Sequence, residues 1–330
     1  MQTASECGEA LPMMKSLIKI SDGMKIIQDD VRVTKYVLHN ENGEGSMTAY
    51  HVVPGIDLIY NDFHIKEYFS NFYCDIPILS IDHCREGRIE WELENGAFTY
   101  VESGDMQIGN KIFHKRKFSF PLNHYHGITI AFYMPEAQQS FQERFSNFSI
   151  NFESIYKKYA SQRRPFIMRA QESIQHIFSE LYQVPESIQF EYFKIKILEL
   201  LLFLSVTNPE KDYEFKSSVP RIQAQKIKFL MEFIRTHIDD HHTIEELSLK
   251  FHMNPTSMKK CFKEVYGIPI YTYIRTHRMK MAAHRLCESN AGILEIANCV
   301  GYCNSSKFAH AFKEILGCSP KEYRNQFKIS

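Results

Sequence analysis

Residues 293–324 read ILEIANCVGYCNSSKFAHAFKEILGCSPKEYR, and part of this sequence also occurs about fifty residues earlier. Residues 258–269 read MKKCFKEVYGIP, and residues 308–320 read FAHAFKEILGCSP. Both contain the pattern F-K-E-[VI]-x-G, beginning at Phe262 and at Phe312. Because an internal repeat indicates a duplicated structural unit, this stretch predicts two copies of one small fold.

The apolar residues of both copies follow the period of an α-helix. A spacing of i, i+3, i+4 and i+7 occurs four times, within residues 244–251, 258–265, 293–300 and 308–315. The offset between the copies is 49 residues in the first helix and 50 in the second, which predicts one extra residue in the second turn. Each copy is therefore predicted to be a short helix, a tight turn and a second helix. Flanking helices at 225–237, 270–287 and 320–327 are predicted to complete the core.

The expected helix ends carry suitable capping residues. Starts are predicted where a polar cap precedes Glu or Pro: Thr243 with Glu246, Asn254 with Pro255, and Ser319 with Pro320 and Glu322. Gly267 and Gly317 stand where a left-handed C-cap is needed.

The polar face of each second helix carries hydrogen-bond donors. These residues are Thr256, Ser257, Lys259, Lys260 and Lys263 in the first copy, and Ser306, Lys307, His310 and Lys313 in the second. A major groove admits an α-helix, and these side chains can reach base edges or phosphates in it. A solvated face of an ordinary helical domain would look the same in a single copy. Two copies in a basic region favour double-stranded DNA as the partner.

The formal net charge of the 330 residues is zero, but the charges are unevenly distributed. Residues 221–330 contain 17 Lys and Arg against 10 Asp and Glu, a net charge of +7. The first 220 residues therefore carry a net charge of −7. This asymmetry favours a C-terminal domain that binds a polyanion and an N-terminal domain that does not.

The duplicated region resembles the AraC/XylS family of bacterial transcription regulators. The resemblance rests on I-x-x-I-A, G-[YF], S-x-F-x-x-x-F-K and G-x-S-P-x-x-Y-R, which follow in this order within residues 293–324. It implies that the two units lie at the ends of one connecting helix, here about residues 269–287. Such a helix is about 28 Å long, so the two units can read major-groove segments about one turn apart. Ala309 and His310 stand where longer donors would be expected, so the first unit is predicted to contribute more electrostatic affinity.

The first 135 residues are predicted to form strands, because apolar and polar residues alternate around Trp91 and Tyr100. Turns are expected at residues 86–87, 94–96 and 103–105. Many short strands favour a small barrel or sandwich, and the family resemblance implies a cupin-like barrel that senses a small molecule. The predicted fold class is α+β, with an N-terminal β-rich cupin-like barrel, a helical middle segment and a C-terminal all-α domain with two helix-turn-helix units.

The predicted domains are a barrel sensor (1–135), a helical segment (136–210), a linker (211–222) and a DNA-binding domain (223–330). Residues 164–183 and 187–206 are predicted to be two helices separated at Val184-Pro185. Ile195, Leu198, Leu202 and Val206 form an apolar stripe on the second helix. This stripe either packs on the barrel or forms the surface of a homodimer, and the sequence leaves both open.

Three residues of the barrel are candidate effector ligands: Trp91, His124 and His126. The two histidines share one face of a strand and His83 could lie nearby, but no carboxylate or third histidine clearly completes a metal set. No metal and no cofactor are therefore predicted. No Cys-His or Ser-His-Asp spacing and no phosphate-binding glycine loop can be recognised, so the chain is predicted not to be an enzyme.

We expect a cytoplasmic transcription activator that binds double-stranded DNA, responds to a small-molecule effector and contacts RNA polymerase. The first 20 residues do not read as a signal peptide, and the most apolar run, 195–206, is too short to cross a membrane. The eight cysteines show no C-x-x-C spacing and are expected to be reduced thiols. Two alternatives stay open: a cupin-type enzyme with a DNA-targeting domain, and an effector-free regulator controlled by its abundance.

Overall fold

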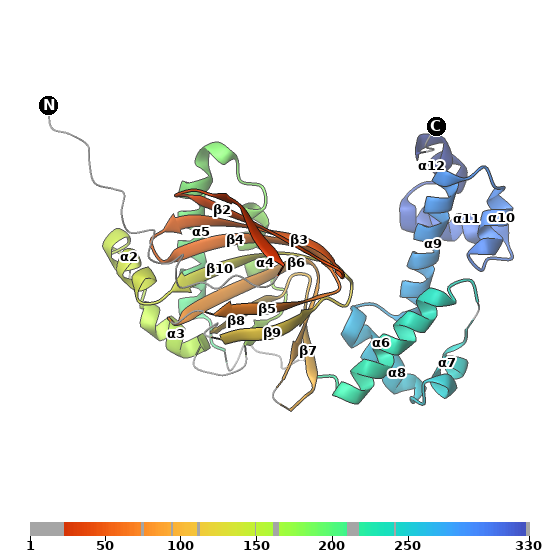
Figure 1. The fold of residues 1–330 in the computed structure, drawn as a ribbon, viewed down its shortest axis with the longest axis horizontal. Helices are drawn as coiled ribbons and strands as arrows, with labels where there is room; N and C mark the ends of the chain where they lie inside the picture. The colour runs from red at the N-terminus through yellow and green to blue at the C-terminus, as the bar shows by residue number, and fades with distance from the viewer. Residues whose placement is uncertain are drawn as a thin grey trace. The chain divides into compact units, whose positions relative to one another are not determined.

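The computed structural model describes residues 23–73, 76–93, 95–110, 113–148, 150–160, 165–209, 218–240 and 242–327. Contacts divide the chain into two compact units. The first consists of Met1–Asn95 and Thr99–Ser218, and the second of Gly96–Phe98 and Val219–Ser330. The first unit combines a sheet with helices and the second is helical, so the predicted α+β class is confirmed (Figure 1). Of the predicted linker, residues 211–217 lie outside the described residues.

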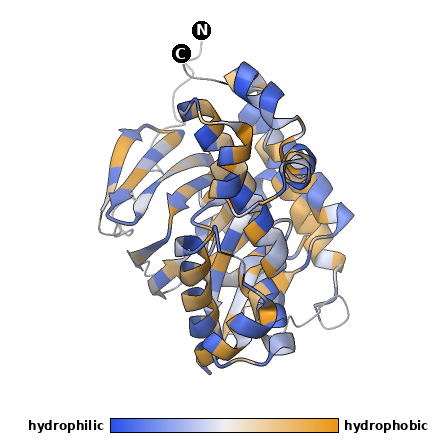
Figure 2. Ribbon diagram, turned by 90° about the vertical axis from the view of Figure 1, so that its right-hand side faces the viewer, coloured by the Kyte–Doolittle hydropathy of each residue, from blue (hydrophilic) through white to orange (hydrophobic). Residues whose placement is uncertain are grey.

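The N-terminal unit is built on antiparallel strands that form a half-barrel (Figure 1). One sheet has the order β1-β2-β3-β4-β10-β6-β8-β11; β7 pairs with β6, and β9 pairs with β5 and β6. The bounds are Met24–Asp29 (β1), Val33–Asn40 (β2), Gly43–Val53 (β3), Ile56–Ile65 (β4), Glu67–Tyr73 (β5), Ile78–Glu92 (β6), Phe98–Glu102 (β7), Met106–Asn110 (β8), Phe113–Ser119 (β9), Tyr125–Tyr133 (β10) and Phe166–Met168 (β11). Hydrophobic and hydrophilic residues alternate along these strands (Figure 2).

The predicted turn at residues 86–87 is wrong. β6 continues through these residues, and its register with β10 shifts at His126, which marks a β-bulge. Gly87 has a φ of 88°, and a Cβ there would lie 2.0 Å from the carbonyl oxygen of His124. Because a bulge bends its strand, the two halves of β6 contribute to different sheets. Turns do occur at Asn95–Gly96 and at residues 103–104, as predicted.

The alternation around Trp91 does not separate buried from exposed residues. Arg88 and Glu90 are 2% and 7% exposed, so the polar side chains of this segment are as buried as Trp91. Arg88 donates to a Glu102 carboxylate oxygen at 2.5 Å, and the Tyr100 hydroxyl donates to Glu90 at 2.9 Å. A buried polar side chain needs such partners, and they make the layer between β6 and β7 stable.

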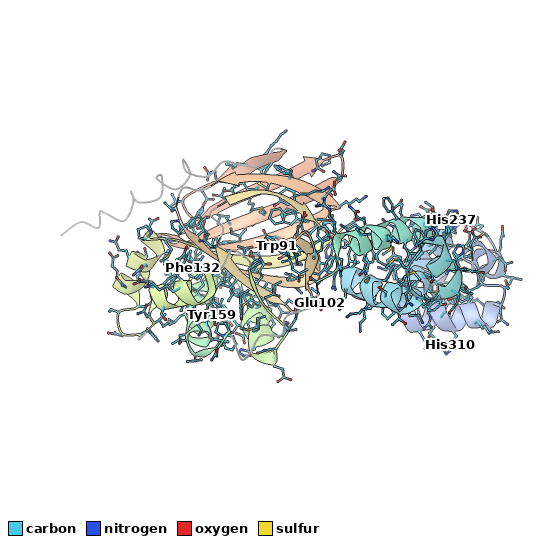
Figure 3. All side chains as sticks on the ribbon, turned by 90° about the horizontal axis from the view of Figure 1, so that it is seen from below. Trp91, Glu102, Phe132, Tyr159, His237 and His310 are labelled. Carbon is cyan, nitrogen blue, oxygen red and sulfur yellow. The ribbon has the colours of Figure 1, made fainter. Side chains whose placement is uncertain are left out.

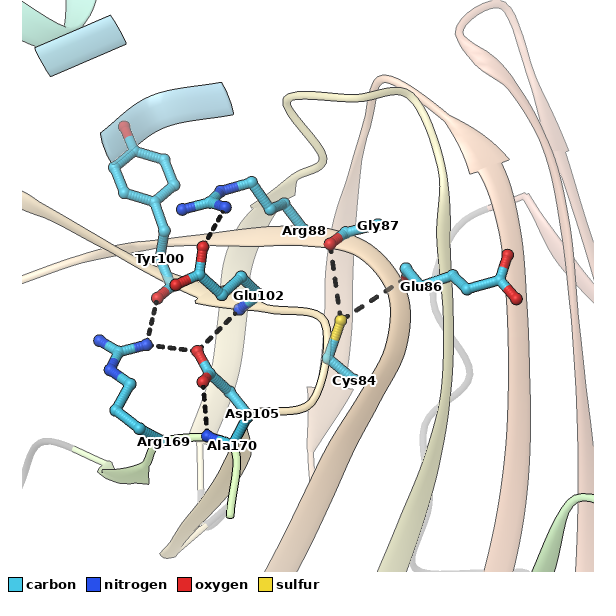
Figure 4. A network of polar contacts seen from close by, with 9 residues as sticks. All are labelled: Cys84, Glu86, Gly87, Arg88, Tyr100, Glu102, Asp105, Arg169 and Ala170. Atoms are coloured by element: carbon cyan, nitrogen blue, oxygen red, sulfur yellow. Dashed lines mark hydrogen bonds and ion pairs between the residues drawn. The ribbon is translucent and has the colours of Figure 1, made fainter. Parts of the chain in front are cut away.

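The Gly104–Asp105 turn fastens the sheet to the segment that leads into the helices (Figure 4). The Asp105 carboxylate accepts the backbone N–H of Glu102 at 3.0 Å and that of Ala170 at 3.3 Å. It also pairs with the Arg169 guanidinium. Asp105 is 1% exposed, so this buried carboxylate is satisfied by two backbone donors and one cation.

Helices cover the outer face of the sheet: α2 (Glu136–Arg144), α3 (Phe152–Ala160), α4 (Glu172–Leu181), the short η1 (Glu186–Ile188) and α5 (Gln189–Val206). One large core joins the sheet to these helices, and it includes Phe132 on β10 and Tyr159 on α3 (Figure 3). The sequence predicted a single helix over 164–183. The structure instead pairs Phe166–Met168 with β8 as strand β11 before α4 begins.

The apolar stripe predicted on α5 is not the side by which the helix packs. The packed side consists of Phe193, Lys196, Ile197, Leu200, Leu201 and Leu204. Ile195, Leu202 and Val206 are 60%, 41% and 83% exposed, and only Leu198 of the predicted stripe contacts the core. Because α5 is apolar on most sides, helical periodicity alone could not show which side would be buried.

The C-terminal unit consists of helices α6 (Arg221–Thr236), α7 (Ile244–Lys250), α8 (Pro255–Tyr266), α9 (Ile270–Glu288), α10 (Ile293–Cys299), α11 (Ser305–Leu316) and α12 (Pro320–Phe327). The repeated apolar residues form its cores: Phe262 and Phe312 are both 0% exposed. The duplicated helix-turn-helix prediction is therefore confirmed. The predicted helix at 225–237 begins four residues earlier, directly after Pro220.

Candidate nucleic-acid interface

Local capping sets the start and the end of the two repeated helices α8 and α11. The Asn254 side chain accepts the backbone N–H groups of Thr256 and Ser257, and the Asn304 side chain accepts that of Lys307. Gly267 and Gly317 close the helices in the left-handed region, with φ of 82° and 81°. Both C-caps stand where the sequence predicted them.

The turns before the two helices differ by one residue, as the change in offset predicted. Four residues separate α7 from α8, and five separate α10 from α11. His252 in the first turn and Gly301 in the second have φ of 48° and 78°. The extra residue is absorbed in the turn, so the apolar faces of the helices keep their register.

The residues predicted to face DNA lie on the solvent-facing side of α8 and α11. Met258, Phe262, Phe308 and Phe312 hold the opposite side in the core. Exposed donors are Thr256, Lys259, Lys260 and Lys263 on α8, and Ser306, Lys307, His310 and Lys313 on α11; Ser257 is half-buried. Each helix therefore presents a set of cations and hydroxyl or imidazole groups from a rigid support.

Both helices have a glutamate at the repeated position, but Glu314 on α11 is exposed whereas Glu264 on α8 is half-buried. Glu314 Oε2 lies 3.4 Å from His310 Nδ1, and the same carboxylate pairs with Arg275 of α9. His310 stands on the surface of the C-terminal unit (Figure 3). An open hollow of about 440 Å³ lies beside it, lined by Arg275, Tyr302, Ser306, Lys307, His310 and Ala311. That the first unit contributes more electrostatic affinity stays a prediction.

The connecting helix α9 has a buried arginine that joins the two repeats. Arg278 is 6% exposed, and its Nε and Nη2 donate to the carbonyl oxygens of Ile238 and Asp240 at 2.7 and 2.8 Å. Its Nη1 donates to the carbonyl oxygen of Gly301 in the second turn at 3.4 Å. Arg278 is not among the residues predicted from the sequence. The one sequence feature that indicates its burial is its position on the apolar side of α9, four residues before Ala282.

The structure does not bring the three candidate effector ligands together. Trp91 is 7% exposed and packs edge-on against Phe118, within a cluster that also contains Tyr125. His126 follows Tyr125 on β10, so its side chain points to the other face of the sheet, where it packs against Tyr182. His124 lies near His64, with ring centroids 4.9 Å apart. Trp91 belongs to the core of the half-barrel, and the histidines do not face it.

The inner face of the half-barrel carries a polar row among apolar residues. One line of paired residues crosses six strands: Thr34, Ala49, Ile59, Thr129, Asp82 and Gln107. The Asp82 carboxylate accepts from Thr129 at 2.6 Å and from Ser80 at 3.0 Å. Asp82 and Thr129 are 8% and 9% exposed, so hydrogen-bonding groups lie at the base of this face.

A hydroxyl, an imidazole and a carboxylate lie in line at one end of the same face. Thr34 Oγ1 is 2.9 Å from His51 Nε2, and His51 Nδ1 is 2.8 Å from Asp57 Oδ1. The Thr34 hydroxyl donates to Asp29 at 3.0 Å and is 2% exposed. A nucleophile must reach its substrate and give its proton to the imidazole. This hydroxyl does neither, so the line links neighbouring strands and gives the enzyme alternative no support.

Two helix-turn-helix units joined by one long helix define the C-terminal unit as a DNA-binding domain of the double helix-turn-helix class. A family model described as a helix-turn-helix domain matches residues 247–326. The regulatory protein PocR of Salmonella typhimurium is 28% identical over 120 residues, which are 36% of this chain and 40% of PocR. The bifunctional transcriptional activator and DNA repair enzyme AdaA of Bacillus subtilis is 31% identical over 103 residues, 31% of this chain and 49% of AdaA.

Among solved structures, the C-terminal domain of AraT, a response regulator from Geobacillus stearothermophilus, is similar to this unit. It is 29% identical, with a TM-score of 0.31, over 32% of this chain and 88% of that chain. The chain spans less than half the length of PocR and of AdaA. The C-terminal unit belongs to the AraC family of helix-turn-helix domains. No helix in the described ranges has the length and apolarity needed to span a membrane.

Proposed function

We propose that this chain is a transcription activator that binds two successive major-groove segments with α8 and α11. The observation that carries the proposal is the pair of exposed donor faces at the two ends of α9, which is about 28 Å long. Successive major-groove segments on one side of DNA are about 34 Å apart, so a single chain can reach both. The net charge of +7 in residues 221–330 supports binding to phosphates.

The proposal includes a small effector bound on the inner face of the half-barrel. An aromatic cluster around Tyr125 adjoins the polar row that contains Thr129 and Asp82. Such a face suits a molecule with an apolar body and a hydrogen-bonding group. RNA polymerase is the proposed protein partner, and the cytoplasm the proposed location. The exposed stripe of Ile195, Leu202 and Val206 is the surface on which a homodimer would form.

The experiment that tests DNA binding compares lysines on α8. Lys259→Ala and Lys260→Ala should each weaken binding to the operator by about 1–3 kcal/mol, because these residues stand in the first half of the helix, where base edges are read. Lys263→Ala should weaken binding to all sequences about equally and reduce the salt slope by about one, because it lies further along, toward the phosphates. Gel-shift titrations at several salt concentrations, on operator and on unrelated DNA, separate these effects.

Lys228→Ala is a matched control, since that lysine lies on α6 and its Nζ stands over the ring of Phe98. The affinity of the Lys228→Ala variant for the operator should stay within a factor of about two of the affinity of the parent protein. Unchanged operator affinity in both the Lys259 and Lys260 variants would show that the recognition side of α8 lies elsewhere.

A further inference from the structure

Five side chains of types that can ligate a metal, three histidines and two carboxylates, lie together on the outer face of the half-barrel. Asp62 and His64 alternate along β4, so they share one face, and Asp62 pairs in register with His126 on β10. His126 in turn pairs with Glu86 on β6. His124, which immediately precedes β10, then stands opposite His64. The antiparallel register thus brings together residues that lie up to 64 positions apart in the sequence.

Within this group, Asp62, His64 and His124 lie close enough together to hold one metal ion. One ligand atom from each lies within 4.8 Å of the others. His64 Nε2 is 3.2 Å from Asp62 Oδ1. A tetrahedral ion with bonds of about 2.0–2.2 Å holds its ligand atoms about 3.3–3.6 Å apart. The side chains of Asp62 and His64 are 51% and 59% exposed, so they are free to make the small rotations that remain.

The chemistry of the three groups selects the type of ion. Two imidazoles with one carboxylate suit Zn²⁺, Co²⁺ or Ni²⁺, whereas Ca²⁺ and Mg²⁺ prefer oxygen ligands only. The nearby Arg85 guanidinium does not occupy the position proposed for the ion. Its Nε lies 3.7 Å from Glu86 Oε1, and the guanidinium stands over the ring of Tyr182. Glu86 Oε2 lies 3.6 Å from His124 Nε2, and a small rotation of the exposed Glu86 side chain would let it accept from the imidazole and orient the ring, as carboxylates commonly do behind metal-binding histidines.

We propose that Asp62, His64 and His124 bind one divalent transition-metal ion of the zinc type, with water in the remaining position. The ion connects β4 to the segment that leads into β10 on the outer face of the half-barrel. It therefore stabilises the N-terminal unit from the face opposite to the inner face.

The test uses the full chain, treated with a chelator and then titrated with ZnCl₂ and CoCl₂. Cys299 and Cys303 are exposed, and cysteine thiolates are good ligands of zinc-type ions, so both are replaced by Ser in the parent protein. Titration calorimetry should show one ion per chain, and bound Co²⁺ should show a visible absorption band without a thiolate charge-transfer band. At a metal concentration of about 100 times Kd, the melting temperature of the N-terminal unit should rise by about 5–10 °C.

The variants decide the assignment. His64→Gln and His124→Gln should each weaken binding at least about tenfold, and the double variant should lose the absorption band. His39→Gln is the matched control, because His39 is 82% exposed and lies 4.0 Å from Glu44 in the same sheet. Its affinity should equal that of the parent. A double variant that binds as tightly as the parent, or a parent that binds neither ion at millimolar concentration, would overturn the proposal.

Discussion

At the scale of single residues, a buried histidine makes the N-terminal unit sensitive to acid. His83 on β6 is 2% exposed, and its ring stacks on Phe178 of α4 with centroids 4.3 Å apart. Within the described part of the chain, neither ring nitrogen has a hydrogen-bond partner. Burial therefore lowers the pKa of His83 from 6.5 to about 4, since the charged imidazolium would lose its hydration.

We predict that the free energy of unfolding of the N-terminal unit falls as the pH drops from about 6.5 to 4. In this range the unfolded chain binds a proton that the folded histidine excludes, so acid favours the unfolded state. A pKa lowered from 6.5 to about 4 corresponds to a loss of about 3 kcal/mol, complete below the folded pKa. Urea unfolding of the parent and of His83→Leu at several pH values measures this loss.

His83→Leu keeps an apolar side chain of similar size against Phe178 and should remove most of this pH dependence. His39→Leu serves as the control, because His39 is 82% exposed and its replacement should leave the pH dependence as it is. Equal pH dependence in the parent and in His83→Leu would mean that His83 takes up its proton in the folded state.

At the scale of elements, the two repeats should depend equally on one aromatic residue each. Phe262 and Phe312 are 0% exposed and pack against Tyr266 and Tyr323, with centroids 4.9 and 5.5 Å apart. Phe262→Ala and Phe312→Ala should each cost about 3–5 kcal/mol, a large share of the stability of a small unit. Thermal unfolding followed by circular dichroism measures this loss.

Phe229→Ala provides a control for the loss of a phenyl ring, because Phe229 on α6 is 70% exposed. It should change stability by no more than about 0.5 kcal/mol. If Phe262→Ala and Phe312→Ala melted at the temperature of the parent, the repeated position would not be a core position.

Elements that depend on neighbouring residues could be predicted from the sequence. The Thr243–Glu246 capping box has both of its hydrogen bonds, at 2.9 and 3.2 Å, and α12 has the predicted bounds Pro320–Phe327. Such helices begin and end where local backbone groups find partners within a few residues. The donor residues on α8 and α11 followed from the same periodicity, because the apolar side of a helix determines its polar side.

Features that depend on distant pairing could not be predicted. The sequence predicts a turn at Gly87 because glycine suits both a turn and a bulge, and only the pairing of β6 with β10 distinguishes the two. His64 and His124 come together only through the register of β4 with β10. Arg278 likewise finds its carbonyl partners 23 to 40 residues away. Sequence periodicity holds no information about such contacts.

At the scale of the whole molecule, the charges and the chemistry are divided between the two units. Residues 221–330 carry a net charge of +7 and the first 220 residues a net charge of −7. The basic part contains both donor helices, and the acidic part contains the inner face proposed for the effector. For an effector to control transcription, it must bind more tightly to one functional state of the chain than to another, because equal affinity would shift nothing.

We predict that an effector on the inner face changes transcription and the fluorescence of Trp91, the single tryptophan of the chain. Trp91 packs in the aromatic cluster that adjoins the polar row, so a molecule bound there alters its surroundings. Ile59→Phe fills the middle of the row, where Ile59 pairs with Thr129, and should abolish both responses. DNA binding by the isolated fragment 221–330 should not respond to the effector.

Reporter transcription is compared for the parent, for Ile59→Phe and for a chain that lacks residues 1–210, over a series of effector concentrations. Transcription that still depends on the effector after this deletion would place the sensor in the C-terminal unit.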